Sequence, residues 1–338
     1  MTPLQFEGAH EATWSGFEQQ LAQARGSRRQ RSELRGPDFL AAYRQCCEHL
    51  ALARDRGYPV HLLERLERMT AEGHQLIYRR HSWGLAGLLA MARTGFPRAV
   101  RAHWPHVLVA ALLLFGPMLV MLVAVARRPE LVTTVMSPGT AAEYEQMYSP
   151  AAEALGRPRT AGTDVAMFGY YIRHNIGIAF QCFAGGVLFG IGSLWFLLQN
   201  GLLIGATAGY LAARGLSGTF FPFVATHSAF ELTAIVLAGA AGLRIGQALV
   251  APGRQRRSQA LAQAGRDTAP IVYGLVAMLV IAALLEAFWS SSAWMPVPAK
   301  FGAAALCWIA VLSYFLRAGR GDADRNGQDR HGQDAHGD

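Results

Sequence analysis

Long apolar runs fill the chain from about residue 104 onward and predict a bundle of membrane-spanning α-helices. Crossing a hydrocarbon core of about 30 Å takes roughly 20 residues of helix. We expect six helices, at residues 104–126, 177–198, 200–213, 220–249, 271–289 and 299–316. The run at 200–213 is short for a crossing, so it is either a tight hairpin partner of the preceding helix or a re-entrant segment. Both alternatives place Gln199-Asn200-Gly201 in a turn.

The first 103 residues have the pattern of amphipathic helices in water. Apolar and aromatic residues recur at steps of three and four along residues 1–26 and would line one helix face: Phe6, His10, Trp14, Phe17 and Leu21. Further helices are expected over about 38–56 and 60–93, because Asp38 can cap the first and Gly57-Tyr58-Pro59 separates the two. Residues 1–103 are therefore predicted to form a soluble three-helix domain that ends in a juxtamembrane segment.

Basic residues are concentrated beside the predicted bundle of residues 104–316. Residues 1–103 hold 15 Arg against 10 Asp and Glu, and the 250–270 loop holds four Arg against Asp267. Such residues favour the cytoplasmic side of a membrane. With six crossings, both termini and the 250–270 loop lie in the cytoplasm, and the 127–176 loop lies outside. The net charge of +8 therefore indicates membrane topology and no nucleic-acid partner.

Two segments outside the bundle carry further predictions. The 127–176 loop should contain a short helix from Ala141 to Leu155, either an ordinary loop helix or a contact surface. That helix would present three polar side chains: Glu143, Glu145 and Tyr148. Residues 317–338 are rich in Gly, Asp and Arg and lack apolar anchors, so this tail is predicted to be disordered.

Arginines at two places suit the headgroup region of a membrane. Arg98 and Arg101 precede Trp104 at the start of the first apolar run, as expected of a segment anchored at the lipid interface. Arg244 lies near the inner end of the 220–249 helix, from which its long side chain could reach the headgroups.

Glycines recur every four residues along three of the predicted helices. The positions are Gly186 and Gly190, then Gly201, Gly205 and Gly209, then Gly242 and Gly246. Small residues at this spacing let helix backbones approach closely, which drives helix association in lipid. The contact is either within the bundle or between copies in a homo-oligomer.

Polar residues within the apolar runs form the main candidate site. His227 and Glu231 are four residues apart and so share one helix face. In the predicted topology, four more residues reach the same outer level: Arg173, His174, Asn175 and Glu286. An ion pair of Arg173 with Glu231 or Glu286 would offset the cost of burying either charge.

Three interpretations of these polar residues compete. They form a polar knot that fixes helix packing, a path for a proton, ion or small solute, or a catalytic site. The sequence HSAFE from His227 to Glu231 differs from the HExxH pattern of zinc proteases, and no further ligands are evident. We therefore expect neither an enzyme nor a bound metal or cofactor.

Several motifs resemble those of the stage II sporulation protein M family of bacterial integral membrane proteins. They are Asn175-Ile-Gly-Ile-Ala-Phe180, Gln199-Asn200-Gly201-Leu-Leu-Ile-Gly205, His227-Ser-Ala-Phe-Glu231-Leu232, Ala238-Gly-Ala-Ala-Gly-Leu243, Pro252-Gly253 followed by Arg254–Arg257, and Glu286-Ala-Phe288. The pattern Phe6, His10-Glu11 and Trp14 resembles the long proteobacterial branch. Where the family has His-Gly, this chain has His227-Ser228.

The resemblance implies a multi-pass, non-enzymatic protein of the bacterial inner membrane that sits in the lipid bilayer and assembles protein partners of the envelope. The family member of spore formers is a scaffold that recruits peptidoglycan-degrading partners, so cell-wall remodelling proteins are the expected class. The alternative from the residues themselves is a transporter or channel that uses the polar residues above. The fold class predicted here is all-α: a membrane helix bundle with an N-terminal soluble helical domain.

Overall fold

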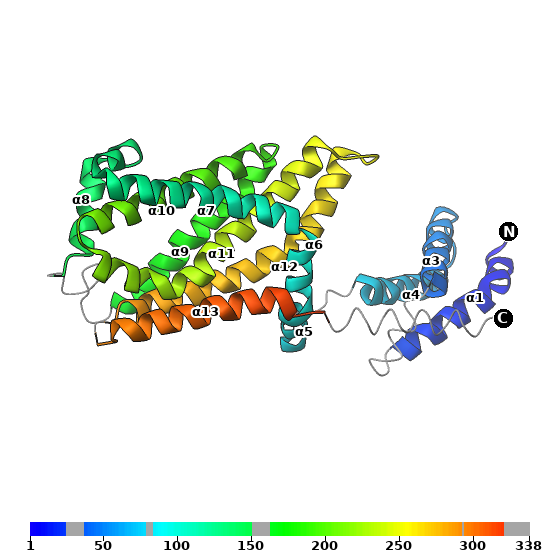
Figure 1. The fold of residues 1–338 in the computed structure, drawn as a ribbon. Helices are drawn as coiled ribbons and strands as arrows, with labels where there is room; N and C mark the ends of the chain where they lie inside the picture. Colours follow the sequence, from blue (N-terminus) through cyan, green and yellow to red (C-terminus); the bar gives the residue numbers. More distant parts are fainter. Residues whose placement is uncertain (25–36, 79–83, 151–162, 293, 321–338) are drawn as a thin grey trace, which may run out of the picture. The chain divides into compact units, whose positions relative to one another are not determined.

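The computed structural model describes residues 1–24, 37–78, 84–150, 163–292 and 294–320, and the regular elements in these ranges are all helices (Figure 1). The all-α prediction is therefore confirmed. Contacts divide the chain into two compact units, Met1–Gly87 and Leu88–Asp338. The link between the predicted helices at 1–26 and 38–56 lies almost wholly outside the described residues, and the predicted disordered tail lies outside them beyond residue 320.

Three helices build the first unit: α1 (Pro3–Ala24), α3 (Pro37–Asp55) and α4 (Val60–Tyr78). The predicted helical stripe is confirmed, because Phe6, Trp14, Phe17 and Leu21 are all buried in one core. The third helix is shorter than the predicted 60–93. After residues 79–83, which are not described, the chain forms α5 (Leu85–Ala90), a π-helical turn η1 (Met91–Gly95) and α6 (Phe96–Ala102).

The second unit is a bundle of long helices with short connecting elements. In order, these are α7 (Trp104–Arg127), η2 (Pro129–Thr134), α8 (Pro138–Met147), α9 (Thr163–Ala184), η3 (Gly185–Val187), α10 (Ile191–Ala213), α11 (Ser217–Val250), α12 (Arg257–Leu284), η4 (Leu285–Ser290) and α13 (Val297–Arg317).

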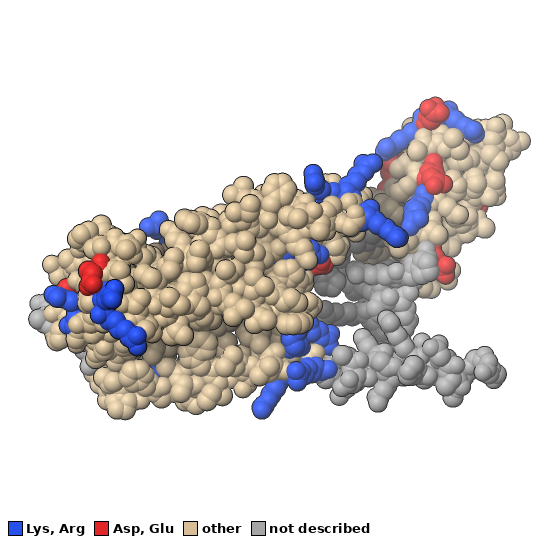
Figure 2. Space-filling view, turned by 45° about the horizontal axis from the view of Figure 1, so that its top comes forward, with Lys and Arg blue, Asp and Glu red and all other residues tan. Residues whose placement is uncertain are grey.

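Among the described residues, five helices are long and apolar enough to cross a membrane: α7, α10, α11, α12 with η4, and α13. Figure 2 shows a broad surface without charged side chains between charged groups at its ends. The protein is therefore a multi-pass membrane protein that sits in a lipid bilayer. The 22-residue α9 is not among the five, but it packs on α10, α11 and α12.

The helices give the bundle two ends. At one end, here the α8 end, the carboxylate of Glu145 accepts hydrogen bonds from Arg214 at 2.8 Å and Tyr210 at 3.1 Å. At the opposite end, the α6 end, Arg101 donates hydrogen bonds to main-chain oxygens of Phe315 and Ala318, both at 2.7 Å. Helices α7 and α10 run parallel from the α6 end to the α8 end, whereas α11 runs back.

The predicted turn at Gln199-Asn200-Gly201 is wrong. These residues lie inside α10, where the side chain of Asn200 donates to the main-chain oxygen of Phe196 at 2.7 Å. The chain turns instead at 185–190, between α9 and α10, so the predicted helices 177–198 and 200–213 are replaced by these two. Phe189 and Gly190 have positive φ angles of 54° and 86°, which terminate the helical path.

Three other predicted boundaries also shift. The loop predicted over 127–176 already becomes helical at Thr163, and α12 begins at Arg257, inside the loop predicted over 250–270. The short helix predicted from Ala141 to Leu155 is α8, which begins at Pro138, where Ser137 accepts a capping hydrogen bond from the Thr140 amide at 3.2 Å. That helix ends at Met147, and residues 151–155 lie outside the description.

The glycine repeats serve contacts within the bundle. A Cβ atom on Gly201, Gly205 or Gly209 would come closer than 3.0 Å to a main-chain oxygen of α7. A Cβ on Gly186 or Gly246 would meet main-chain atoms at similar range between the 185–190 turn and α11, and a Cβ on Gly242 would meet main-chain oxygens at the end of α9. Gly190 is the remaining member, and its Cα faces Gly246. These glycines therefore let main chains within the bundle approach one another closely.

Candidate functional site

The polar site begins on α11, near the α8 end. His227 and Glu231 face the bundle interior from successive turns, and their side chains are 5% and 19% exposed. The ring nitrogen Nε2 of His227 lies 3.8 Å from the Glu231 carboxylate, too far for a hydrogen bond. The helix places both residues as the four-residue spacing predicts.

A second element, the π-helical turn η4, supplies the opposite wall. The hydroxyl of Ser290 lies 3.0 Å from His227 Nδ1. Glu286 lies one turn earlier, and one ligand atom each of His227, Glu231 and Glu286 lie within 4.8 Å of one another. Single π-helical turns within α-helices occur often at functional sites.

The N-terminal part of α13 closes the site with Lys300. Its side chain is buried and donates a hydrogen bond to the main-chain oxygen of Ser290 at 2.8 Å. The main-chain oxygen of Lys300 in turn accepts from the Thr226 hydroxyl at 3.2 Å. Sequence reasoning missed these residues, although one signal was present: Lys300 is the only lysine among 31 basic residues and lies at the edge of an apolar run.

Tyr148, which follows α8, lies close to the same carboxylates. It is buried against Phe220 and Phe223 of α11. Burial raises the pKa of Tyr148, and the nearby carboxylates of Glu286 and Glu231 act in the same direction. Of the three polar residues predicted on this helix, Tyr148 is buried, Glu145 is paired with Arg214, and Glu143 is exposed.

The three residues predicted on α9 divide differently. Arg173 is exposed and, among the described residues, forms no ion pair with Glu231 or Glu286, so the predicted pair is absent there. His174 is exposed and its ring stacks on Tyr170, with centroids 5.8 Å apart. Asn175 is buried, and its amide nitrogen has no hydrogen-bond partner among the described residues.

An apolar stretch separates this site from the α6 end. The ten residues from Ala234 to Leu243 of α11 carry no polar side chain, and they pack with Leu197 of α10 and Leu279 of α12 in one core. At about 1.5 Å per residue this stretch is about 15 Å long, half the thickness of a hydrocarbon core.

Beyond that stretch, Arg244 meets a carboxylate of α12. Its guanidinium group lies 3.3 Å from the Asp267 carboxylate, which also accepts a hydrogen bond from Gln263 at 2.7 Å. Arg244 therefore takes part in a polar contact between two helices, a role that the sequence-based prediction of a reach to the lipid headgroups did not include. Together with the His227–Ser290 contact, it shows that α11 and α12 run antiparallel.

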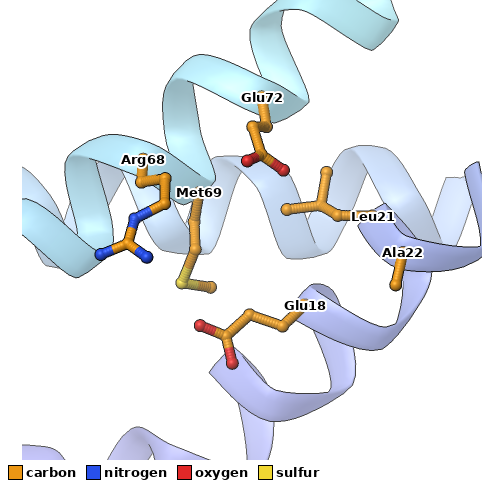
Figure 3. Close-up of a pocket in the computed structure, with 6 residues that line it drawn as sticks. All are labelled: Glu18, Leu21, Ala22, Arg68, Met69 and Glu72. Atoms are coloured by element: carbon orange, nitrogen blue, oxygen red, sulfur yellow. The ribbon is translucent and has the colours of Figure 1, made fainter. Parts of the chain in front are cut away.

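A hollow in the described part of the N-terminal unit lies between α1 and α4. In Figure 3, Glu18, Leu21 and Ala22 of α1 face Arg68, Met69 and Glu72 of α4 across it. The nearby Arg65 forms ion pairs with Glu11 and Glu18 at 2.8 and 3.0 Å. This hollow combines charged rims with an apolar floor and brings no nucleophile and base together.

A family model agrees with this architecture. The model described as stage II sporulation protein M matches residues 78–291, more than half of the chain. The chain belongs to the stage II sporulation protein M family. A second model, described as a domain of unknown function (DUF8413), matches residues 4–79, which form α1, α3 and α4. No curated protein and no solved structure matches the chain. The stage II sporulation protein M match includes His227, Glu231 and Glu286.

Proposed function

We propose that this protein is a non-enzymatic scaffold of the bacterial inner membrane that assembles envelope proteins, with cell-wall remodelling proteins as the expected class. The observation that carries this proposal is the joining of two different units in one chain. Residues 1–87 have their own apolar core and their own family match, and they are attached to a closed membrane bundle. Such a unit is suited to binding a protein partner beside the membrane.

The proposed orientation places the α6 end in the cytoplasm. Arg98 and Arg101 lie at this end, and so does the connection from α11 to α12 with Arg254, Arg256 and Arg257. Basic residues in short segments flanking membrane helices favour the cytoplasmic side. Both termini are then cytoplasmic, and α8 faces the outside.

The apolar stretch from Ala234 to Leu243 speaks against the alternative of a transporter or channel. A proton or ion path needs polar groups or water along its length, because an unpartnered charge in hydrocarbon is costly. The polar groups around His227 lie to one side of this stretch and are connected to one another. This arrangement supports a fixed polar contact between helices better than a conduction path.

Cross-linking with mass spectrometry in native membranes tests the proposal. The tagged wild type is compared with a chain that lacks residues 1–87. A Trp14→Ala variant is a second test, because it keeps the N-terminal unit in the chain but removes a fully buried side chain from its core. We expect stoichiometric envelope partners on the wild type, and their loss from both variants.

Partner recovery that is unchanged by the deletion would contradict a role for this unit. Self-links alone would indicate a homo-oligomer without further partners. Ion or solute flux through the purified protein in liposomes, abolished by His227→Gln, would establish the transport alternative.

A further inference from the structure

Three side chains from two helices converge in the polar site with the chemistry of metal ligands. The imidazole of His227 and the carboxylates of Glu231 and Glu286 place one ligand atom each within 4.8 Å of the others. Among the described residues, this is the one group of His, Cys, Asp and Glu with such a spacing. All three side chains are buried or partly buried. The sequence places all three residues at one level of the bundle, but the close spacing of Glu286, 55 residues beyond Glu231, follows only from the packing of η4 against α11.

The spacing fits ligands around an ion better than a hydrogen bond. The His227 Nε2 to Glu231 Oε2 distance of 3.8 Å exceeds the 2.7–3.2 Å of an N–H···O hydrogen bond. Nitrogen and oxygen ligands lie about 2.0–2.2 Å from zinc, which in a tetrahedral site separates them by roughly 3.3 Å. Side-chain rotations that bring the ligand atoms closer together by about 0.5–1.5 Å would therefore place all three around one ion.

The neighbouring hydrogen bonds orient His227 for this task. Its Nδ1 lies 3.0 Å from the Ser290 hydroxyl, and the main-chain oxygen of Ser290 is held by Lys300 at 2.8 Å. When Nδ1–H donates to this hydroxyl, the lone pair of Nε2 points toward the glutamates. Histidines that bind metals commonly donate their second ring nitrogen to a partner of this kind, which fixes the tautomer and the ring orientation.

Charge balance favours a divalent ion. Two carboxylates in a low-dielectric site are expensive to bury without compensation. Lys300 directs its ammonium group to the main-chain oxygen of Ser290. A neutral imidazole, two carboxylates and one divalent cation sum to zero net charge.

We propose that His227, Glu231 and Glu286 bind a divalent transition-metal ion, for which zinc is the best match. Imidazole nitrogen and carboxylate oxygen are both common zinc ligands. The ion joins α11 to η4 at the α8 end of the bundle, with three protein ligands and a fourth position open to water. This site is independent of the proposed scaffold function.

Metal titration of the purified full-length protein tests this site. The protein carries a tag without histidine, is stripped with a chelator, and is titrated with Co²⁺ and then Zn²⁺. Bound metal is measured by plasma mass spectrometry, and the visible absorption of Co²⁺ reports its coordination. We expect about one ion per chain, a Co²⁺ spectrum of a four- or five-coordinate site, and a higher melting temperature with metal.

The variants His227→Gln, Glu231→Gln and Glu286→Gln should each lose this ion. Ser290→Ala should keep the stoichiometry and weaken affinity about 10- to 100-fold, because it removes only the orienting contact. His106→Gln is the matched control, since His106 lies near the α6 end and bonds to Gln247 at 3.0 Å. Gel filtration verifies folding of each variant.

Two results would overturn the proposal. The first is a wild type that binds no ion or gives only the spectrum of hexa-aqua Co²⁺, a result that requires no variant to fold. The second is retention of the ion by well-folded Gln variants, which would assign it to adventitious sites such as the tail histidines His331 and His336.

Discussion

The two units of this chain are packed by opposite means. In the N-terminal unit, large side chains fill the core, with Phe6, Trp14 and Phe17 almost fully buried. The indole N–H of Trp14 donates to His49 at 3.0 Å, and the Arg65 guanidinium lies 5.6 Å above its ring. Apolar volume and a few polar contacts at its edge hold this unit together.

In the membrane unit, glycines, which have no side chain, allow main chains of neighbouring segments to come into contact. Gly205 faces the main chain of Met118, and Gly186 faces that of Gly242. Large apolar side chains lie on the outside instead, such as Leu112 and Trp195, which are 63% and 60% exposed.

The difference follows from the solvent of each unit. In water, burying apolar surface contributes about 25 cal/mol per Å², so large side chains are the efficient core material. Lipid offers no such gain, because its chains are as apolar as leucine. Helices in lipid therefore associate through close backbone packing and dispersion, which small residues permit.

Trp14→Ala should have the largest effect of the changes considered, and it should destabilise the N-terminal unit. Loss of a fully buried Trp costs about 3–5 kcal/mol, a large part of the total stability of a small domain. We expect the N-terminal unit to unfold while the membrane unit stays folded, as measured by limited proteolysis in membranes. Leu4→Ala is the control, because Leu4 is 81% exposed. Equal protease resistance of both variants would contradict this account of the core.

Gly205→Ala should destabilise the membrane unit by disturbing the packing of α10 on α7. Its new Cβ meets the main chain of Met118, which cannot rotate away as a side chain can, so we expect a loss of about 1–3 kcal/mol. Gly116→Ala on α7 is matched, since a Cβ there has no neighbour within 4 Å. Melting in detergent, followed by size-exclusion chromatography, measures both. A similar effect of the two changes would mean that helix propensity, and not packing, matters here.

Arg101→Gln should have a smaller effect at the α6 end. It removes the charged donors to the main-chain oxygens of Phe315, in the last turn of α13, and of Ala318, which follows α13. We expect a loss of about 1 kcal/mol, since water can reach part of this end. The same melting assay measures it, with Arg93→Gln as an exposed control. Unchanged melting of the Arg101 variant would show that water replaces these contacts fully.

Acid should weaken the N-terminal unit while sparing the glycine contacts. Burial lowers the pKa of His49 below its ordinary 6.5, and its Nδ1 accepts the Trp14 hydrogen bond in the neutral form. Stability is therefore complete above pH 6.5 and falls as the pH drops toward the lowered pKa. Tryptophan fluorescence melting of residues 1–87, whose core is self-contained, measures this.

His49→Gln should remove that pH dependence, and His61→Gln, at an exposed site, should keep it. A pH dependence that survives the first change would have another source. Arg65 lowers the pKa of Glu11, so the stabilisation from this ion pair is complete above about pH 4.5 and is lost only as the pH falls below that value toward the lowered pKa.

Sequence periodicity predicted most of the fold because each environment selects a recognisable pattern. The aromatic stripe of α1 and the apolar run of α7 were both placed within two residues of their observed ends. The turn between α9 and α10 was misplaced because polarity is a guide to loops only in water. The observed turn contains Val187, Leu188 and Phe189, all more than half exposed, whereas the polar Gln199-Asn200 lies within a helix.

The candidate site was predictable in part. A four-residue spacing on one helix suffices to pair His227 with Glu231, and charge inside an apolar run identified Glu286. Arg173 was expected to join them because a buried charge needs compensation, but α9 directs it outward. The contact of Lys300 with Ser290 depends on how α13 meets η4, and no local pattern encodes such a crossing.

The arginine contacts at the α6 end set an order for biogenesis. Arg98 and Arg101 enter the membrane unit before its first long helix, yet their acceptors are Phe315, Ala318 and Gly319, more than 200 residues later. A ribosome delivers those acceptors last, after every other helix of the bundle has emerged. The join between the first and last helices of the unit is therefore made only after α13 has emerged, and a chain truncated before α13 leaves its bundle open.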